Sequence, residues 1–178
     1  MNRSLFWVAA LWLAIIMPAA AQDVVVCEKE SGDVAIAACD RAIASGKLNK
    51  GQLAWSYHNR AVEYEIKKLH DVAMADYNRA LQVDPDRPSS LVGRGNAYNN
   101  KGDYERALKD YNNAIRLDGK SPNAYQNRGL AYFRMKDFAH ARTDYEMALK
   151  LPPRNNADRD AQTKAREQLD DTLVALRK

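Results

Sequence analysis

The side chains of this chain that could do chemistry are few and scattered. Its three histidines, His58, His70 and His140, stand at unequal intervals and in unlike contexts. The sequence has no G-x-S-x-G, no H-E-x-x-H and no phosphate-cradling glycine loop. Gly93-Arg94-Gly95 falls inside a helical pattern rather than between a strand and a helix, so it carries no nucleotide signal. The sequence therefore predicts no catalytic residue, no metal site, no cofactor and no enzymatic activity.

Arginine and aspartate recur in step along the chain and could form ion pairs. The two columns, each with a period of 34 residues, are Arg60, Arg94 and Arg128, and Asp76, Asp110 and Asp144. Because the aspartates recur with the arginines, the two columns favour a structural ladder, in which each arginine pairs with an aspartate. A row of arginines that binds anionic ligands is less favoured. Partly buried pairs of this kind would fix orientation more than they would add stability. Pairing within one 34-residue unit and pairing between two units both stay open.

The first 21 residues have the pattern of a secretory signal peptide. Arg3 precedes an apolar run from Leu5 to Met17, and Ala19-Ala20-Ala21 offers a cleavage site before Gln22. The apolar run is short for a membrane span of about 20 residues, which favours a cleaved signal over an uncleaved anchor. We therefore expect an exported protein with no stable membrane insertion after cleavage.

Both cysteines, Cys27 and Cys39, lie in the part expected to be exported. In an oxidising compartment an isolated pair at this spacing indicates a disulfide. A redox role is the alternative, but the two residues do not form a C-x-x-C motif. We expect a structural disulfide.

A period of 34 residues runs through the middle of the chain. The matching columns are Tyr64, Tyr98 and Tyr132; Ala73, Ala107 and Ala141; Tyr77, Tyr111 and Tyr145; and Ala80, Ala114 and Ala148. A period of this length indicates stacked supersecondary units, and each unit contains two helical patterns. Small residues such as Gly95 and Gly129 would let the two helices approach, so the tyrosines are expected to form the core.

These columns resemble the tetratricopeptide repeat. The resemblance places three repeats at 54–87, 88–121 and 122–155 and implies an all-α, right-handed solenoid of antiparallel helix pairs. Leu91, His70 and Gly119 depart from the pattern of the family. For function, the resemblance implies a binding surface and no particular ligand.

The two ends of the solenoid are expected to be closed by other segments. Residues 22–53 form a degenerate helical unit in which Cys39 replaces the repeat tyrosine, so a disulfide to Cys27 would staple a short preceding segment onto this helix. Residues 156–178 are expected to form a capping helix, because the last unit of a stack otherwise exposes its packing face. A protruding helix that binds a partner is the alternative for this segment.

The resemblance also implies a concave groove lined by the first helix of each repeat. Partner-binding residues are expected on that face: Trp55, His58, Glu65, Asn96, Asn99, Asn100, Asn123, Gln126, Phe133 and Arg134. The amides in the centre suit the backbone of an extended peptide, and Trp55 and Phe133 could anchor apolar side chains. The alternative is that these amides are merely solvated. The carboxylate clamp of chaperone-binding relatives is not expected. The positions at which that clamp would need Lys, Asn and Arg are occupied here by His58, Val62, Gly93, Asn123 and Asn127.

The function expected from these features is non-covalent. The formal charge of +4 is spread along the chain without a basic tract, so no nucleic-acid partner is expected. We expect an adaptor or assembly factor of the cell envelope that holds a peptide or protein partner; the periplasm is the expected location, and secretion is possible. The alternative is an accessory protein for envelope polysaccharide or peptidoglycan, with Trp55 and Phe133 as sugar platforms. The oligomeric state stays open.

Overall fold

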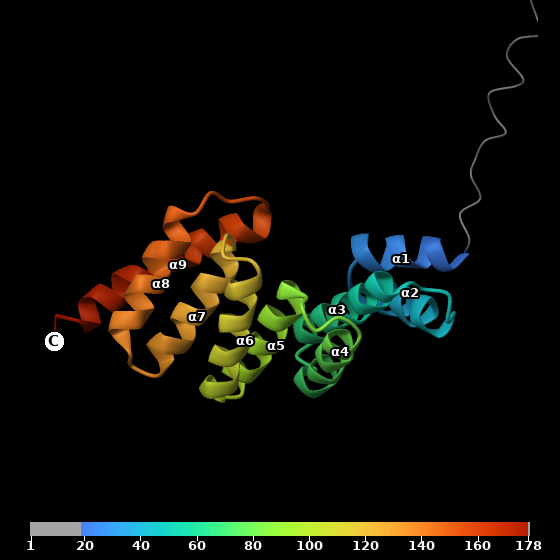
Figure 1. Cartoon of the computed structure of the whole chain (residues 1–178), viewed down its shortest axis with the longest axis horizontal. Helices are drawn as coiled ribbons and strands as arrows, with labels where there is room; N and C mark the ends of the chain where they lie inside the picture. Colours follow the sequence, from blue (N-terminus) through green and yellow to red (C-terminus); the bar gives the residue numbers. More distant parts are fainter. Residues whose placement is uncertain (1–18, 178) are drawn as a thin grey trace, which may run out of the picture.

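The computed structural model describes residues 19–177, which form nine helices and no strand (Figure 1). The helices are α1 (Ala19–Lys29), α2 (Gly32–Ala44), α3 (Lys50–Ile66), α4 (His70–Val83), α5 (Pro88–Asn100), α6 (Tyr104–Leu117), α7 (Pro122–Arg134), α8 (Phe138–Lys150) and α9 (Asn156–Ala175). The predicted all-α fold is confirmed. Most of the expected signal peptide lies outside the described residues.

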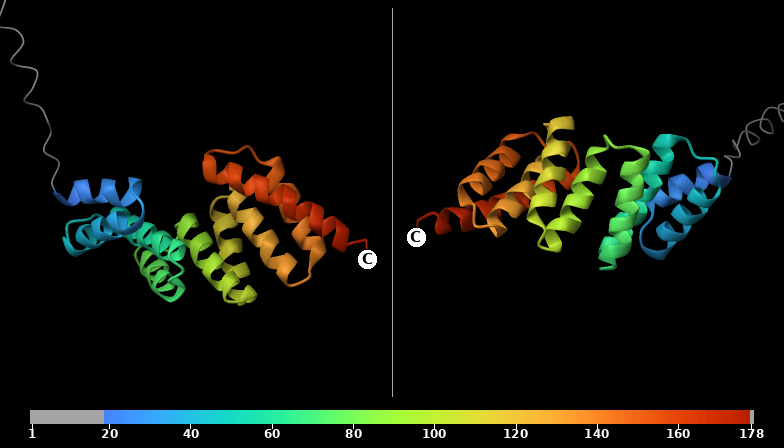
Figure 2. Two further views of the ribbon diagram at one scale, coloured as in Figure 1. Left: turned by 180° about the vertical axis from the view of Figure 1, so that it is seen from behind. Right: turned by 60° about the horizontal axis from the view of Figure 1, so that its bottom comes forward.

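The helices stack as successive pairs along the length of the molecule, which forms an elongated solenoid (Figure 2). The pair α3–α4 packs against α5–α6, which packs against α7–α8, and the first helices of neighbouring pairs also touch. α3 begins at Lys50, one turn before the expected start of the first repeat at residue 54. The extension follows from Asn49 and Gln52, which form a capping box at this point.

Local residue choices set where the helices begin and turn. Ser121 and Asp137 accept hydrogen bonds from the backbone amides of Ala124 and His140, and so cap α7 and α8. At the turn between the two helices of each repeat, one residue adopts a positive φ: Lys68 (60°), Gly102 (78°) and Lys136 (63°). Only Gly102 is a residue that adopts this conformation without steric cost. The tight turn is therefore imposed by the packing of the pair in two of the three repeats.

The core confirms the roles predicted for the small residues and the tyrosines. Tyr111 and Tyr145 are fully buried. A Cβ atom added to Gly95 would lie 2.6 Å from Cε1 of Tyr111, and one added to Gly129 would lie 2.7 Å from Cε1 of Tyr145. Each tyrosine ring on a second helix thus occupies the space that the glycine leaves on the first helix.

The N-terminal unit contains the predicted disulfide between Cys27 and Cys39, whose Cα atoms lie 4.9 Å apart. Both cysteines are buried. The short segment before α2, expected to be tied onto that helix by the disulfide, is itself the helix α1, which packs against α2 and α3. Val24-Val25-Val26 gives this helix low intrinsic propensity, so its formation depends on that packing.

The C-terminal segment forms the expected helix α9, capped by Asn155. α9 lies against α8 and α7 at the end of the stack (Figure 2). Ala161 and Ala165 are buried in this contact, whereas Leu176 at the C-terminal end of α9 is exposed. None of the helices within residues 19–177 is long and apolar enough to span a membrane.

Candidate functional site

A groove of about 810 Å³ runs along α3 and α5 and reaches the first turn of α7. Its walls come from α3, α5 and α7, with contributions from α4, α6 and the start of α9. Six of the ten predicted partner-binding residues line it: Trp55, His58, Glu65, Asn96, Asn100 and Asn123. The repeat geometry thus brings together side chains that are up to 68 positions apart in the sequence.

One end of the groove is built around His58. The His58 ring stacks on Trp55, with centroids 5.0 Å apart and an interplanar angle of 12°, and its Nδ1 lies 3.2 Å from Ser90 Oγ. Burial, and then the positive charge of Arg87, lower the pKa of His58 to about 4, so the ring is neutral at pH 7. Ser90 is fully buried, so the Ser90–His58 pair offers no accessible nucleophile.

The middle of the groove presents amide side chains. Asn96 accepts a hydrogen bond of 2.7 Å from the Tyr111 hydroxyl, which leaves its NH₂ group free of bonds within the described residues. Asn100 is exposed, and its Oδ1 lies 3.4 Å from Arg134 Nη1. Asn123 accepts from Asn127 through its side chain and its backbone. These amides retain donors and acceptors for a ligand.

Glu65 is the acidic group of the α3 wall. Its side chain is 19% exposed, and its Oε2 lies 2.8 Å from Nδ1 of His70. Its Oε1 is buried and has no hydrogen-bond partner. Tyr77, which sequence analysis assigned to the core, also lines the groove; burial first, and then the charge of Glu65, raise the pKa of its hydroxyl.

Four predicted residues do not line the groove. Asn99 is buried, and its Oδ1 has no partner. Gln126 is also buried, and its Nε2 donates to Gln168 of α9 at 2.9 Å. Phe133 packs in the cluster that also contains Ala165 of α9. Arg134 donates at 3.0 Å to the backbone carbonyl of Asn99.

The position of α9 explains two of these differences and adds residues that the sequence did not predict. Because α9 packs on α7, it covers Gln126 and Phe133 where a further repeat would otherwise continue the groove. The start of α9 instead supplies Asp158 and Lys164 to the groove wall. The sequence analysis predicted a capping helix over residues 156–178 but not that its side chains would enter the groove.

The arginine and aspartate columns form the predicted ladder, and each pair lies within one repeat. Arg60 binds Asp76, Arg94 binds Asp110 and Arg128 binds Asp144, each through Nε and Nη2 at 2.6–2.8 Å. The remaining nitrogen, Nη1, reaches the preceding unit, where the acceptors are Asp40, Asn78 and Asn112. The guanidinium groups are therefore engaged by the protein itself.

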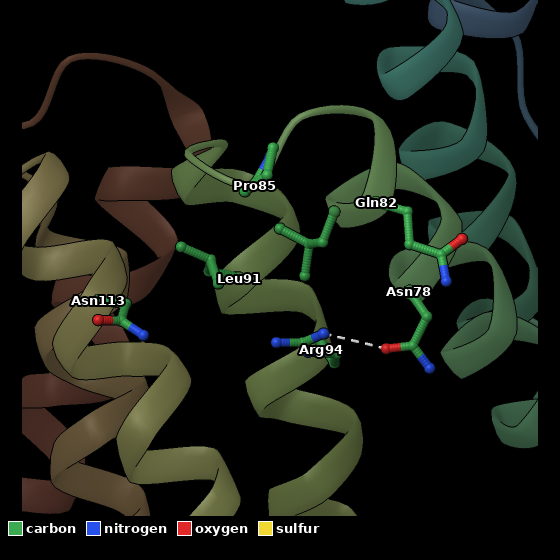
Figure 3. Close-up of a pocket in the computed structure, with 7 residues that line it drawn as sticks. Asn78, Gln82, Pro85, Leu91, Arg94 and Asn113 are labelled. Carbon is green, nitrogen blue, oxygen red and sulfur yellow. Dashed lines mark hydrogen bonds between the residues drawn. The ribbon is translucent and has the colours of Figure 1, made fainter.

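A second, smaller hollow of about 390 Å³ lies between α4, α5 and α6 (Figure 3). Gln82, Pro85, Leu91 and Asn113 line it, together with the Arg94–Asn78 hydrogen bond of 3.0 Å. This hollow sits beside a ladder contact and contains no residue predicted to bind a partner. It serves below as a reference surface for experiments on the groove.

Comparison with known families settles what the repeats are. Family models described as "tetratricopeptide repeat" match residues 56–87 and 122–155, and a model described as "TPR repeat" matches residues 95–136. The chain contains tetratricopeptide repeats. No curated protein gives a significant match to the sequence.

Solved structures of tetratricopeptide repeat domains are similar to this chain. The first TPR of Spaghetti (RPAP3), bound to the HSP90 peptide SRMEEVD, is 28% identical with a TM-score of 0.56, covering 67% of this chain and 95% of that chain. The second TPR domain of human RPAP3, in complex with the HSP70 peptide SGPTIEEVD, is 27% identical with a TM-score of 0.55, covering 66% and 98%. The type III secretion translocator chaperone SycD of Yersinia enterocolitica is similar in fold alone, with 16% identity, a TM-score of 0.65 and coverage of 83% and 97%.

Proposed function

We propose that this protein is a non-enzymatic adaptor or assembly factor of the cell envelope that holds a peptide segment of a partner in its groove. The observation that carries the proposal is the groove itself, which follows the first helices of the first two repeats and reaches the start of the third. Within residues 19–177, no group of three His, Cys, Asp or Glu side chains could hold a metal ion. The groove and its polar lining support binding of a partner.

The lining of the groove suits an extended peptide. Asn96, Asn100 and Asn123 come from two neighbouring first helices and offer both donors and acceptors to a peptide backbone. Val62 and Val92 supply apolar contacts between the polar groups. A few polar groups that fix orientation within an apolar wall are typical of binding sites.

The similar structures support a peptide as the ligand class but not the same peptide. The peptides bound to the two RPAP3 domains both end in Glu-Glu-Val-Asp. In this groove, His58 is neutral at pH 7 and Glu65 contributes a negative charge. We therefore expect a partner whose bound segment is not an acidic chain terminus.

Two features support a location in the cell envelope. Residues 1–21 have the pattern of a signal peptide. The disulfide between Cys27 and Cys39 would persist only in an oxidising compartment. The expected result of N-terminal sequencing on protein recovered from the periplasm is a chain that begins at Gln22, and full-length protein in the cytoplasmic fraction would contradict the proposal.

The glycan alternative receives less support from the arrangement of the two aromatic residues it needs. Trp55 lines the groove, where its ring contacts His58 and Arg87. Phe133 packs instead in the cluster with Tyr145 and Ala165. The two rings therefore do not form one platform for a sugar chain.

Capture of partners from envelope extract tests the groove, with matched variants on two surfaces. The groove variant is Asn100→Ala with Asn123→Ala; the reference variant is Gln82→Ala with Asn113→Ala, in the second hollow (Figure 3). We expect a protein, identified by mass spectrometry, that the parent and the reference variant retain and the groove variant loses. Equal capture by all three proteins would remove the groove as the binding site.

A further inference from the structure

The carboxylate of Glu65 is only partly used by the protein. Among the ion pairs of residues 19–177, it joins only the one with His70, through Oε2, and no lysine or arginine binds it. Its other oxygen, Oε1, is buried and has no hydrogen-bond partner, while the side chain as a whole is 19% exposed. A carboxylate has about four acceptor sites, and a charge-assisted bond is the strongest kind it can accept. Glu65 thus retains capacity for a donor that arrives from the groove.

Next to Glu65, the first repeat exposes an apolar strip at the turn between α3 and α4. We define this strip, the apolar edge, as Val62, Ile66, Leu69 and Val72, whose exposed fractions range from 36% to 68%. Val62 and Ile66 line the groove, and Leu69 and Val72 follow them in the chain, at the turn and in the first turn of α4. Exposed aliphatic side chains that gather beside a binding groove mark a contact for a partner.

The apolar edge is specific to the first repeat. One period later, the corresponding residues are Asn96, Asn100, Asp103 and Arg106. All four of these are polar or charged, so the solenoid does not need aliphatic residues at these places to fold. The difference between the repeats makes the α3 end of the groove chemically distinct from its centre.

We propose that the α3 end of the groove recognises a peptide in which a basic residue stands beside an aliphatic residue. The proposal rests on the peptide-binding function proposed above. The ammonium or guanidinium group binds the Glu65 carboxylate, and the aliphatic side chain packs on the apolar edge. Because Oε1 is buried, the donor meets Oε2, which can accept a second hydrogen bond beside that of His70.

The other charged side chains of the groove do not offer a second acidic group to a ligand. Asp158 is bound by Arg154, whose Nε lies 3.0 Å from its Oδ2. Lys164 is exposed on α9, toward the opposite end of the groove. Glu65 is therefore the acidic group that the groove can offer to a ligand, and it lies next to the apolar edge.

Blocked octapeptide libraries test this inference directly. One central position is fixed as Lys, norleucine or Glu, Leu follows it, and the remaining positions are random. Biolayer interferometry gives the apparent Kd of the protein for each immobilised library. We expect the Lys library to bind at least fivefold more tightly than the norleucine library, and the Glu library to bind most weakly. The Lys preference should shrink in high salt because ions screen exposed charges.

Two pairs of variants test which residues of the protein produce the differences in binding between the libraries. Glu65→Gln should bring the Lys and norleucine libraries within twofold of each other, while Glu105→Gln, an exposed glutamate outside the groove, should keep the preference. Ile66→Ser should weaken all three libraries, while Val174→Ser, at another exposed aliphatic residue, on α9, should not.

The outcomes separate the two proposals. A parent protein that binds Lys and norleucine libraries equally, or a Lys preference that Glu65→Gln leaves intact, overturns the assignment of a basic residue to Glu65 and leaves groove binding in place. Failure of every library to bind the parent overturns both proposals. Binding of the norleucine library by Glu65→Gln shows that the variant is folded.

Discussion

Arg94 binds both carboxylate oxygens of Asp110, with Nε–Oδ2 and Nη2–Oδ1 distances of 2.7 and 2.8 Å. This bidentate pair closes one helix pair, α5 with α6. The hydrogen bonds that Arg94 donates to Asp110 raise the pKa of Arg94, so the guanidinium is charged throughout the working pH range. Its Nη1 donates to Asn78 of the preceding repeat at 3.0 Å. One side chain thus orients two helices of its own repeat and fixes that repeat against its neighbour.

Removing the acid of this pair should be costly. Asp110→Ala leaves Arg94 half-buried without its partner, and we expect a loss of about 2 to 4 kcal/mol in the free energy of unfolding by urea. The double change Arg94→Met with Asp110→Leu should lose less, since no charge remains to be buried. Asp71→Ala breaks an exposed pair with Lys101 and should leave the urea midpoint unchanged. A loss for Asp71→Ala as large as that for Asp110→Ala would contradict a special role for the ladder.

The contact of Gly129 with Tyr145 gives a second prediction. In Gly129→Ala the new Cβ would lie 2.7 Å from Cε1 and 2.9 Å from Cδ1 of the buried Tyr145 ring. The ring or the helices must shift, and we expect a loss of about 1 to 3 kcal/mol. Gly51→Ala is the matched control, because its Cβ would meet nothing closer than 3.5 Å and alanine favours helix more than glycine does. In thermal melting, the Tm of Gly129→Ala should therefore lie below that of the parent, and the Tm of Gly51→Ala should lie above it.

The repeat columns could be predicted from the sequence because each 34-residue unit places the same position in the same environment. Burial of Tyr111 and Tyr145, and pairing of Arg94 with Asp110, follow from that regularity. The choice between pairing within and between repeats could not be predicted, because both arrangements bring the columns together. The structure shows that one arginine does both, with aspartate as the acceptor within its repeat and asparagine or aspartate in the unit before.

The two ends of the groove were harder to predict than its centre. Gln126 stands at the same repeat position as His58 and Val92, which line the groove, yet it is buried against α9. The direction in which a terminal helix crosses the last repeat depends on long-range packing that no period in the sequence encodes. The same packing removes Phe133 from the groove and brings Lys164 to it.

The disulfide between Cys27 and Cys39 should stabilise one end of the molecule only. On the chain-entropy view, a loop closed by cysteines 12 positions apart contributes about 3 kcal/mol. Because each unit of a solenoid contacts mainly its neighbours, the effect should stay local. In Cys27→Ala with Cys39→Ala, hydrogen exchange should become faster in α1 and α2 and remain unchanged in α7 and α8. Faster exchange throughout the chain would show that the N-terminal unit controls the stability of the whole stack.

His58 should make the stability of the protein depend on pH below neutrality. Burial lowers the pKa of His58 in the folded state to about 4, whereas the unfolded chain titrates near the ordinary value of 6.5. Between these values the unfolded state binds the proton and the folded state does not, so stability falls as the pH falls from about 6.5 to about 4. At pH 4.5 the loss from this group should be roughly 2 to 3 kcal/mol relative to pH 7.5.

The variant His58→Gln lacks the titrating ring. Its free energy of unfolding by urea should therefore fall by less over the same pH interval, and the difference from the parent should be about that amount. The difference between parent and variant should stay constant from pH 7.5 to pH 9, where the imidazole is neutral in both states. Equal losses of stability in parent and variant between pH 7.5 and pH 4.5 would contradict this prediction. They would mean that His58 becomes protonated in the folded protein beside Trp55 and Ser90, and that this end of the groove opens more readily than its burial indicates.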